Sequence, residues 1–313
     1  MKNLGELMDN DFSIDNRSYV TLTMMNDIFE IQYMEKSNFT NNIQKLDADR
    51  YVVLETGEIK EFDKSENRSE NKNSLNQTMK KLRYLINANF SGKPNELWIT
   101  LTFADSLLAR NANAVYLYFN KFIKRLRYKY GKDLEYIAVL EPHEIKNGDI
   151  KNWHGYHFHL LLKSYVRKKI FIPHEDFENI WGLGFCRIER LNNIDNIGAY
   201  LSAYLTNVED NSEIVDCANK KKYIKGARLW LYPKGIRIYR KSKGIKKPTR
   251  IKMTYAEART IIGVEPHYRK KIPIEIDDFQ NTIIYEQFNR RRKKNLSKKK
   301  DSPIIGKHFG DQL

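Results

Sequence analysis

The chain has 313 residues, enough for one substantial core or two modest domains. Its 55 Lys and Arg against 39 Asp and Glu give a net charge of +16, which indicates a polyanionic partner such as DNA. Only two cysteines occur, Cys186 and Cys217, so a disulfide framework and a cysteine zinc site are excluded. No signal peptide, membrane-spanning run or GxxxxGK[ST] phosphate loop is recognisable, and we expect a cytoplasmic protein without its own ATP-driven motor.

Residues 1–70 are polar and only weakly periodic, and we expect them to form a separate N-terminal region. Within them, Tyr51–Phe62 predicts a possible hairpin whose turn lies at Thr56 and Gly57.

The middle of the chain, residues 71–250, alternates helical and strand patterns and is expected to be one domain. Strand, helix, strand, strand and helix around one sheet is α+β architecture. The predicted helices are Ser74–Asn89, Ala112–Tyr130, a short one at Phe177–Trp181, and Asn196–Thr206; the predicted strands are Leu97–Phe103, Leu134–Glu141, Tyr156–Leu162 and Phe185–Leu191.

Towards the C-terminus, Arg228–Tyr239 alternates like a basic strand, and the signals weaken beyond Ala256. Residues 251–313 are therefore predicted to be a basic C-terminal extension. Its end, rich in Lys and Arg from Arg290 to Lys300, is expected to be disordered and available to nucleic acid.

The strongest chemical signal is His157-Phe158-His159, within WHGYHFHLLL. On a strand both imidazoles project from one face and Phe158 from the other, so the pair forms half of a metal site.

Glu141 supplies a third ligand, because it ends the strand that would pair with the histidine strand through the turn at Asn147 and Gly148. Two imidazoles and one carboxylate leave open positions on a divalent ion such as Mg²⁺ or Mn²⁺, where phosphate oxygens would bind. Three nearby residues are rival ligands: His143, Glu144 and His154.

Tyr200 and Tyr204 lie four residues apart in NIGAYLSAYLTN, on one face of the predicted helix. Such a pair is commonly packing. A phenolate attacking a phosphodiester would instead conserve the ester bond as a phosphotyrosine, which permits rejoining.

The order of these motifs resembles the HUH endonucleases, and most closely the rolling-circle replication initiators (Rep proteins) of bacterial plasmids, integrative elements and phages. The resemblance covers about residues 55–250. It rests on WITLTF at Trp98–Phe103, Glu141 with His157 and His159, IWGLGFCRIERL at Ile180–Leu191, Tyr200 with Tyr204, and the basic stretch Tyr239–Pro248.

The resemblance implies a five-stranded antiparallel sheet with flanking helices, with both histidines on the central strand and the tyrosine helix lying over it. It also implies a 5′-phosphotyrosine and a free 3′-hydroxyl that primes a host DNA polymerase, with a host helicase unwinding the duplex. Tyr200 is the expected primary nucleophile and Tyr204 its partner. Many relatives carry lysine three residues after each tyrosine; here those positions are Ala203 and Asn207, and Lys220–Lys222 could substitute.

The expected partner is origin DNA, single-stranded or in a supercoiled duplex. The residues expected to contact it are Lys121, Lys124, Arg125, Arg240, Lys241 and Lys243. Three alternatives stay open: a transposase or mobilisation relaxase with the same chemistry, a DNA-binding protein without catalysis, and a zinc hydrolase.

Overall fold

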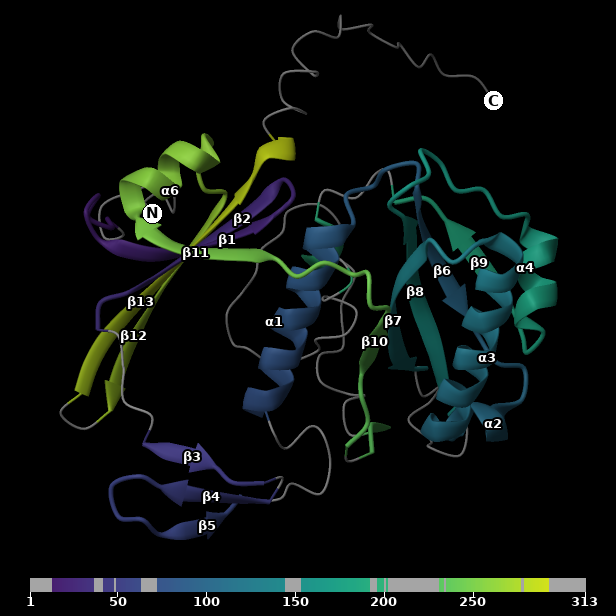
Figure 1. Cartoon of the computed structure of the whole chain (residues 1–313), viewed down its shortest axis with the longest axis horizontal. Coiled ribbons are helices and arrows are strands. Elements are labelled where there is room, and N and C mark those ends of the chain that lie inside the picture. The colour runs from purple at the N-terminus through teal and green to yellow at the C-terminus, as the bar shows by residue number, and fades with distance from the viewer. Residues whose placement is uncertain are drawn as a thin grey trace, which may run out of the picture. The chain divides into compact units, whose positions relative to one another are not determined.

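A computed structural model describes residues 13–36, 42–47, 49–62, 72–143, 153–191, 196–199, 201, 231–233, 235–276 and 279–292. The chain divides into two compact units (Figure 1): an end unit of residues 1–37 with 248–313, and a central unit of residues 38–247. Both are built on antiparallel sheets, so the predicted α+β class is confirmed. Among the described residues, no helix is long and apolar enough to cross a membrane.

The main sheet of the central unit has five antiparallel strands in the order β10-β7-β8-β6-β9, so β8, which carries both histidines, is the middle strand. The sequence prediction of a five-stranded sheet with a central histidine strand agrees with this order. The strands are β6 (Glu96–Leu101), β7 (Leu134–Pro142), β8 (Tyr156–Ser164), β9 (Cys186–Glu189) and β10 (Tyr239–Lys241).

Strand alternation gives this sheet two different faces. His157, His159 and Leu161 project from one side, called here the histidine face, and Phe158 projects from the opposite side. The opposite face is covered by α3 (Ala112–Tyr130), whose Phe119 ring lies 4.6 Å from the Phe158 ring between centroids.

Helix α3 begins and ends where its sequence predicts. The Asn111 side chain accepts hydrogen bonds from the first free backbone N–H groups, and Gly131 ends the helix with a φ of 108°. Two shorter helices accompany it: α2 (Ser106–Arg110) and α4 (His174–Trp181).

Helix α1 (Lys72–Asn89) meets the histidine face at its C-terminal end. The Asn89 backbone oxygen accepts a hydrogen bond from the Lys163 ammonium, and Lys163 lies on β8 two residues beyond Leu161. The apolar stripe of α1, which includes Leu82 and Ile86, is buried in the same core as Trp98 and Leu161.

A small three-stranded sheet also belongs to the central unit: β3 (Ile43–Lys45), β4 (Arg50–Val53) and β5 (Ile59–Glu61). The antiparallel β4–β5 pair is the predicted hairpin, and Gly57 takes a φ of 70° in its turn.

One predicted element is wrong in its described part. Arg228–Tyr239 was expected to be a strand, yet the regular strand β10 starts only at Tyr239. Pro233 has no backbone N–H to donate, and Gly235 has a φ of 76°, so the chain turns before β10.

The end unit combines strands from both ends of the sequence in one antiparallel sheet, ordered β11-β1-β2-β13-β12. Sequence reasoning did not anticipate this pairing. The elements are β1 (Tyr19–Met25), β2 (Ile28–Met34), β11 (Thr249–Thr254), α6 (Tyr255–Ile262), β12 (Tyr268–Ile276) and β13 (Phe279–Asn289).

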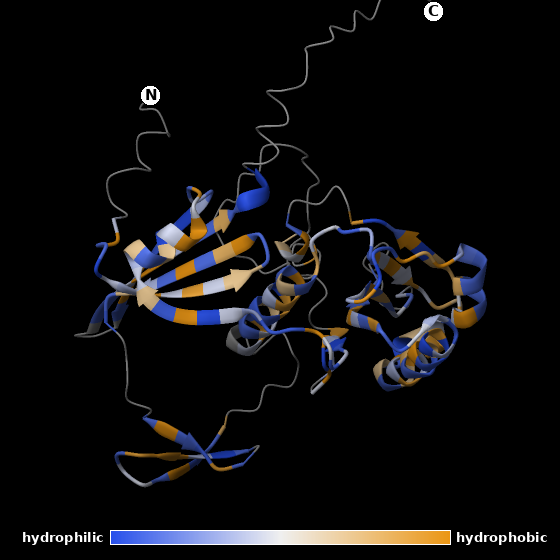
Figure 2. Ribbon diagram, turned by 45° about the horizontal axis from the view of Figure 1, so that its top comes forward, coloured by the Kyte–Doolittle hydropathy of each residue, from blue (hydrophilic) through white to orange (hydrophobic). Residues whose placement is uncertain are grey.

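Helix α6 covers one face of the end-unit sheet. Its Ala258 and Ile262 are buried together with Leu22 and Ile31. The strands show the alternating hydrophobic and hydrophilic bands expected of a sheet with a single apolar core (Figure 2). Thr254 and Glu257 form a capping box that fixes where α6 begins.

Candidate metal centre

Pairing between β7 and β8 brings the predicted metal ligands together. Glu141 lies directly opposite His157, and Val139 lies directly opposite His159. Because directly paired residues project from the same face, Glu141 and both histidines share the histidine face.

The three donor atoms form a compact triangle. The Nε2 atoms of His157 and His159 are 3.0 Å apart, and the Oε2 of Glu141 is 3.3 Å from the first and 2.7 Å from the second. Two cis ligands at about 2.1 Å from an octahedral cation are separated by roughly 3.0 Å, which is close to these edges. Two imidazole nitrogens this close repel unless a proton or cation lies between them. The residues therefore fit a divalent metal, and they form a possible metal-binding group.

Glu141 is held as a carboxylate although it is buried. Burial disfavours its charged form, but hydrogen bonds and charge from His157 and His159 outweigh this effect and lower the pKa of Glu141 to about 2. A ligand that is already ionised needs no deprotonation before it binds a cation.

The second nitrogen of His159 has two neighbours on β6. The indole Nε1–H of Trp98 donates to Nδ1 over 3.3 Å, and the hydroxyl oxygen of Thr100 lies 3.4 Å from the same atom. If Nε2 binds a cation, Nδ1 must carry the ring hydrogen, which Thr100 can accept and Trp98 cannot. Thr100 thus favours the metal-bound tautomer of His159, and Trp98 favours the metal-free one.

The rival ligands lie at the edge of this group. The His143 ring is 4.2 Å from the His157 ring between centroids, and 6.5 Å from the ring of His154. Neither His143 nor His154 belongs to the convergent triangle of Glu141, His157 and His159, and Glu144 lies outside the described residues.

Tyr200 and Tyr204 themselves lie outside the described residues, but the start of their helical segment is described. The Asn196 side chain accepts from the Ala199 backbone N–H, as an N-cap does, and the Gly198 N–H donates to the Asn87 side chain on α1. A methyl group at Gly198 would lie 2.5 Å from that Asn87 oxygen, so the segment packs closely on α1.

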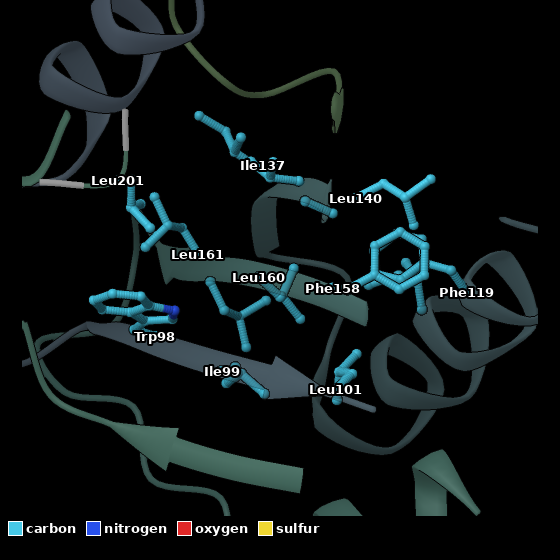
Figure 3. Close-up of a cluster of buried hydrophobic side chains, with 14 of the residues drawn as sticks. Trp98, Ile99, Leu101, Phe119, Ile137, Leu140, Phe158, Leu160, Leu161 and Leu201 are labelled. Atoms are coloured by element: carbon cyan, nitrogen blue, oxygen red, sulfur yellow. The ribbon is translucent and has the colours of Figure 1, made fainter. Parts of the chain in front are cut away.

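Leu201 fixes the same segment against the histidine face. It is buried, and Figure 3 shows it beside Leu161 and near Trp98. Leu161 is two residues from His159 on the same face of β8, a separation of about 7 Å along a strand.

The six basic residues expected to contact DNA do not share one surface. Lys121, Lys124 and Arg125 are on α3, which packs on the face opposite the histidines. Arg125 donates to the backbone oxygen of Ile180 at the end of α4. On and after β10 stand the other three: Arg240, whose guanidinium stacks on the Tyr116 ring at 3.6 Å, then Lys241 and Lys243.

Sequence reasoning assigned no role to Trp98 and Thr100, although both stand in the WITLTF motif. Their two-residue spacing on a strand was the available signal, because it places both side chains on one face.

Comparison with known proteins adds an independent finding. Residues 96–209 match the family of replication-associated proteins designated ORF2 or gene II protein. The matched segment begins at the first residue of β6 and contains Glu141, His157, His159 and both tyrosines, so the resemblance to replication proteins is confirmed. Neither the curated proteins nor the solved structures gave a significant match.

Proposed function

We propose that this protein initiates rolling-circle DNA replication by cutting one strand of an origin and joining a tyrosine to the new 5′ end. The observation that carries the proposal is the convergence of Glu141, His157 and His159 within a segment that matches replication-associated proteins. An initiator is favoured over a transposase or mobilisation relaxase because the matched family is a replication family.

The residues would divide the work as follows. Glu141, His157 and His159 would hold a Mg²⁺ or Mn²⁺ ion, which when bound would polarise the scissile phosphate. Thr100 would keep His159 in the ligating tautomer. The buried Leu201 and Gly198 would hold the tyrosine segment over the histidine face.

In the cutting step, the phenol oxygen of Tyr200 forms a bond to phosphorus, and the bond from phosphorus to the 3′ oxygen breaks. The phenol gives up its proton, and the departing 3′ oxygen takes one up, so the phosphodiester is exchanged and no water is consumed. The free 3′-hydroxyl then serves as a primer. Tyr204 would carry out the later transfer that closes the displaced circle.

The test uses a supercoiled plasmid that carries the DNA surrounding this protein's own gene, incubated with Mn²⁺ or with a chelator. Wild-type protein should give nicked circles and a covalent adduct on the 5′ end only with the metal. Tyr200→Phe keeps the ring and removes the attacking oxygen, so it should lose most adduct. Tyr204→Phe should still cut once.

Tyr128→Phe is the matched control, because Tyr128 is 95% exposed on α3 on the opposite side of the sheet, and it should behave as wild type. Nicking at full rate by the Tyr200→Phe/Tyr204→Phe double variant would refute the tyrosine mechanism. Activity that survives replacement of His157 and His159 by Ala would refute the metal site.

A further inference from the structure

The end-unit sheet has a second face, directed away from α6 and called here the open face. Val20 and Leu22 point into the α6 core, so Tyr19 and Thr21 project from the other side of β1. The register of the five strands carries this side across the whole sheet, because each residue directly paired with an open-face residue also faces that way.

Three tyrosines stand on the open face. Tyr19 on β1 is 73% exposed and Tyr268 on β12 is 46% exposed, whereas Tyr285 on β13 is half-buried. Exposed rings on a sheet surface are costly to leave in water and are suited to stacking on flat ligands.

The charge on the open face is positive. One row of directly paired residues has Lys252 at one end and Lys270 at the other, with Tyr285 next to Lys270. Arg250 lies in the adjacent row, on the same strand as Lys252. The acidic residue of that row, Glu30, is buried and accepts a hydrogen bond from the Gln287 side chain.

The tyrosines and the charges are electrostatic neighbours. Burial raises the pKa of Tyr285, the negative charge of Glu30 adds to this, and the positive charge of Arg250 opposes it. Between the two terminal lysines the row holds the neutral polar residues Thr21 and Gln32. A basic face with aromatic rings and a polar centre matches a ligand that presents both phosphates and bases.

We infer that the open face binds single-stranded DNA, with bases stacked on the tyrosines and phosphates paired with the basic side chains. The inference rests on the proposed function for the choice of DNA. Five strands at about 4.8 Å spacing span roughly 19 Å, too wide for the duplex major groove of about 12 Å. Unpaired bases, by contrast, can lie flat on such a surface, and their stacking is tolerant of sequence.

The experiment measures fluorescence polarisation of a labelled single strand of about 16 nucleotides with the full-length protein in chelator, where no cutting can occur. Tyr19→Ala/Tyr268→Ala should weaken binding by at least about tenfold, since each stacked ring contributes roughly 5- to 100-fold. Tyr19→Phe/Tyr268→Phe keeps both rings and should retain the wild-type affinity. Tyr128→Ala, an equally exposed tyrosine of the central unit, should have no effect.

The charges are tested separately through the salt dependence. Lys252→Gln should reduce the slope of log affinity against log salt by about 0.7, the value for one phosphate contact to a single strand. Lys271→Gln is the matched control, because Lys271 is exposed on the α6 side of the neighbouring edge strand β12, and it should leave the slope unchanged.

A direct readout comes from photocrosslinking to an iodouracil-substituted strand, which should mark Tyr19, Tyr268 or Tyr285 and not Tyr128. Wild-type affinity of the double alanine variant, or crosslinks confined to the central unit, would overturn the inference even if nicking is intact. Stronger loss on duplex than on single strands would also overturn it. If nicking fails but these binding results hold, the proposed function is wrong and the open face still binds single strands.

Discussion

Opposite effects on metal affinity are expected from two residues that contact the same atom of His159. Trp98→Phe removes the indole N–H that donates to Nδ1, while Thr100→Val removes the oxygen that can accept from it. The metal-free state, in which Nε2 points at Glu141 over 2.7 Å, is stabilised by Trp98 and not by Thr100.

The sizes follow from the geometry. A hydrogen bond as long as 3.3 Å lies in the lower part of the usual range, about 0.5–1 kcal/mol. Its loss in Trp98→Phe should therefore tighten Mn²⁺ binding by roughly two- to fivefold. Loss of the outer-shell acceptor in Thr100→Val should weaken Mn²⁺ binding by about tenfold or more.

Isothermal titration of metal-free, full-length protein with Mn²⁺ measures both effects. Trp181→Phe is the matched control, because Trp181 is also buried and its indole N–H also donates to a neighbour, the Thr102 backbone oxygen over 2.7 Å. It should lower the melting temperature as Trp98→Phe does, without changing Mn²⁺ affinity. Weaker binding by Trp98→Phe, or no change in both variants, would refute the tautomer reasoning.

Three further outcomes are expected. Gly198→Ala should reduce covalent adduct at least tenfold with Mn²⁺ affinity unchanged, since its methyl group would press the tyrosine segment off Asn87; equal loss of metal binding would contradict that separation. Mn²⁺ affinity should fall as the pH drops below about 6.5, where imidazoles gain protons, and titration at several pH values checks this. Truncation after Arg292 should lower the salt slope of DNA binding and spare cutting of a short origin strand; a lost nicking activity would give the tail a catalytic role.

The metal group could be predicted from sequence because its information is local. The alternation of His157 and His159 sets their common face, and one turn between adjacent strands delivers Glu141. The choice of Glu141 over His143 was a question of register, and the residue that ends an apolar strand was the one whose partner is His157.

Other features depend on pairings between distant parts of the chain, which periodicity alone does not reveal. Trp98 and Thr100 reach His159 only because β6 pairs with β8, across two intervening helices and β7. The basic side of α3 was a correct amphipathic pattern, yet Arg125 serves the end of α4, a contact that no sequence pattern marks.

The mixed origin of the end-unit sheet has a consequence for synthesis on the ribosome. β1 and β2 emerge early, but their edge partners β11 and β13 emerge only after the whole central unit has been made. Until then the β1–β2 hairpin exposes unpaired strand edges and the apolar side of Leu22 and Ile31. A nascent chain stalled after residue 247 could thus complete the strands of the nicking sheet while lacking a finished DNA platform, and chaperones that hold exposed hairpins would be expected to act on it.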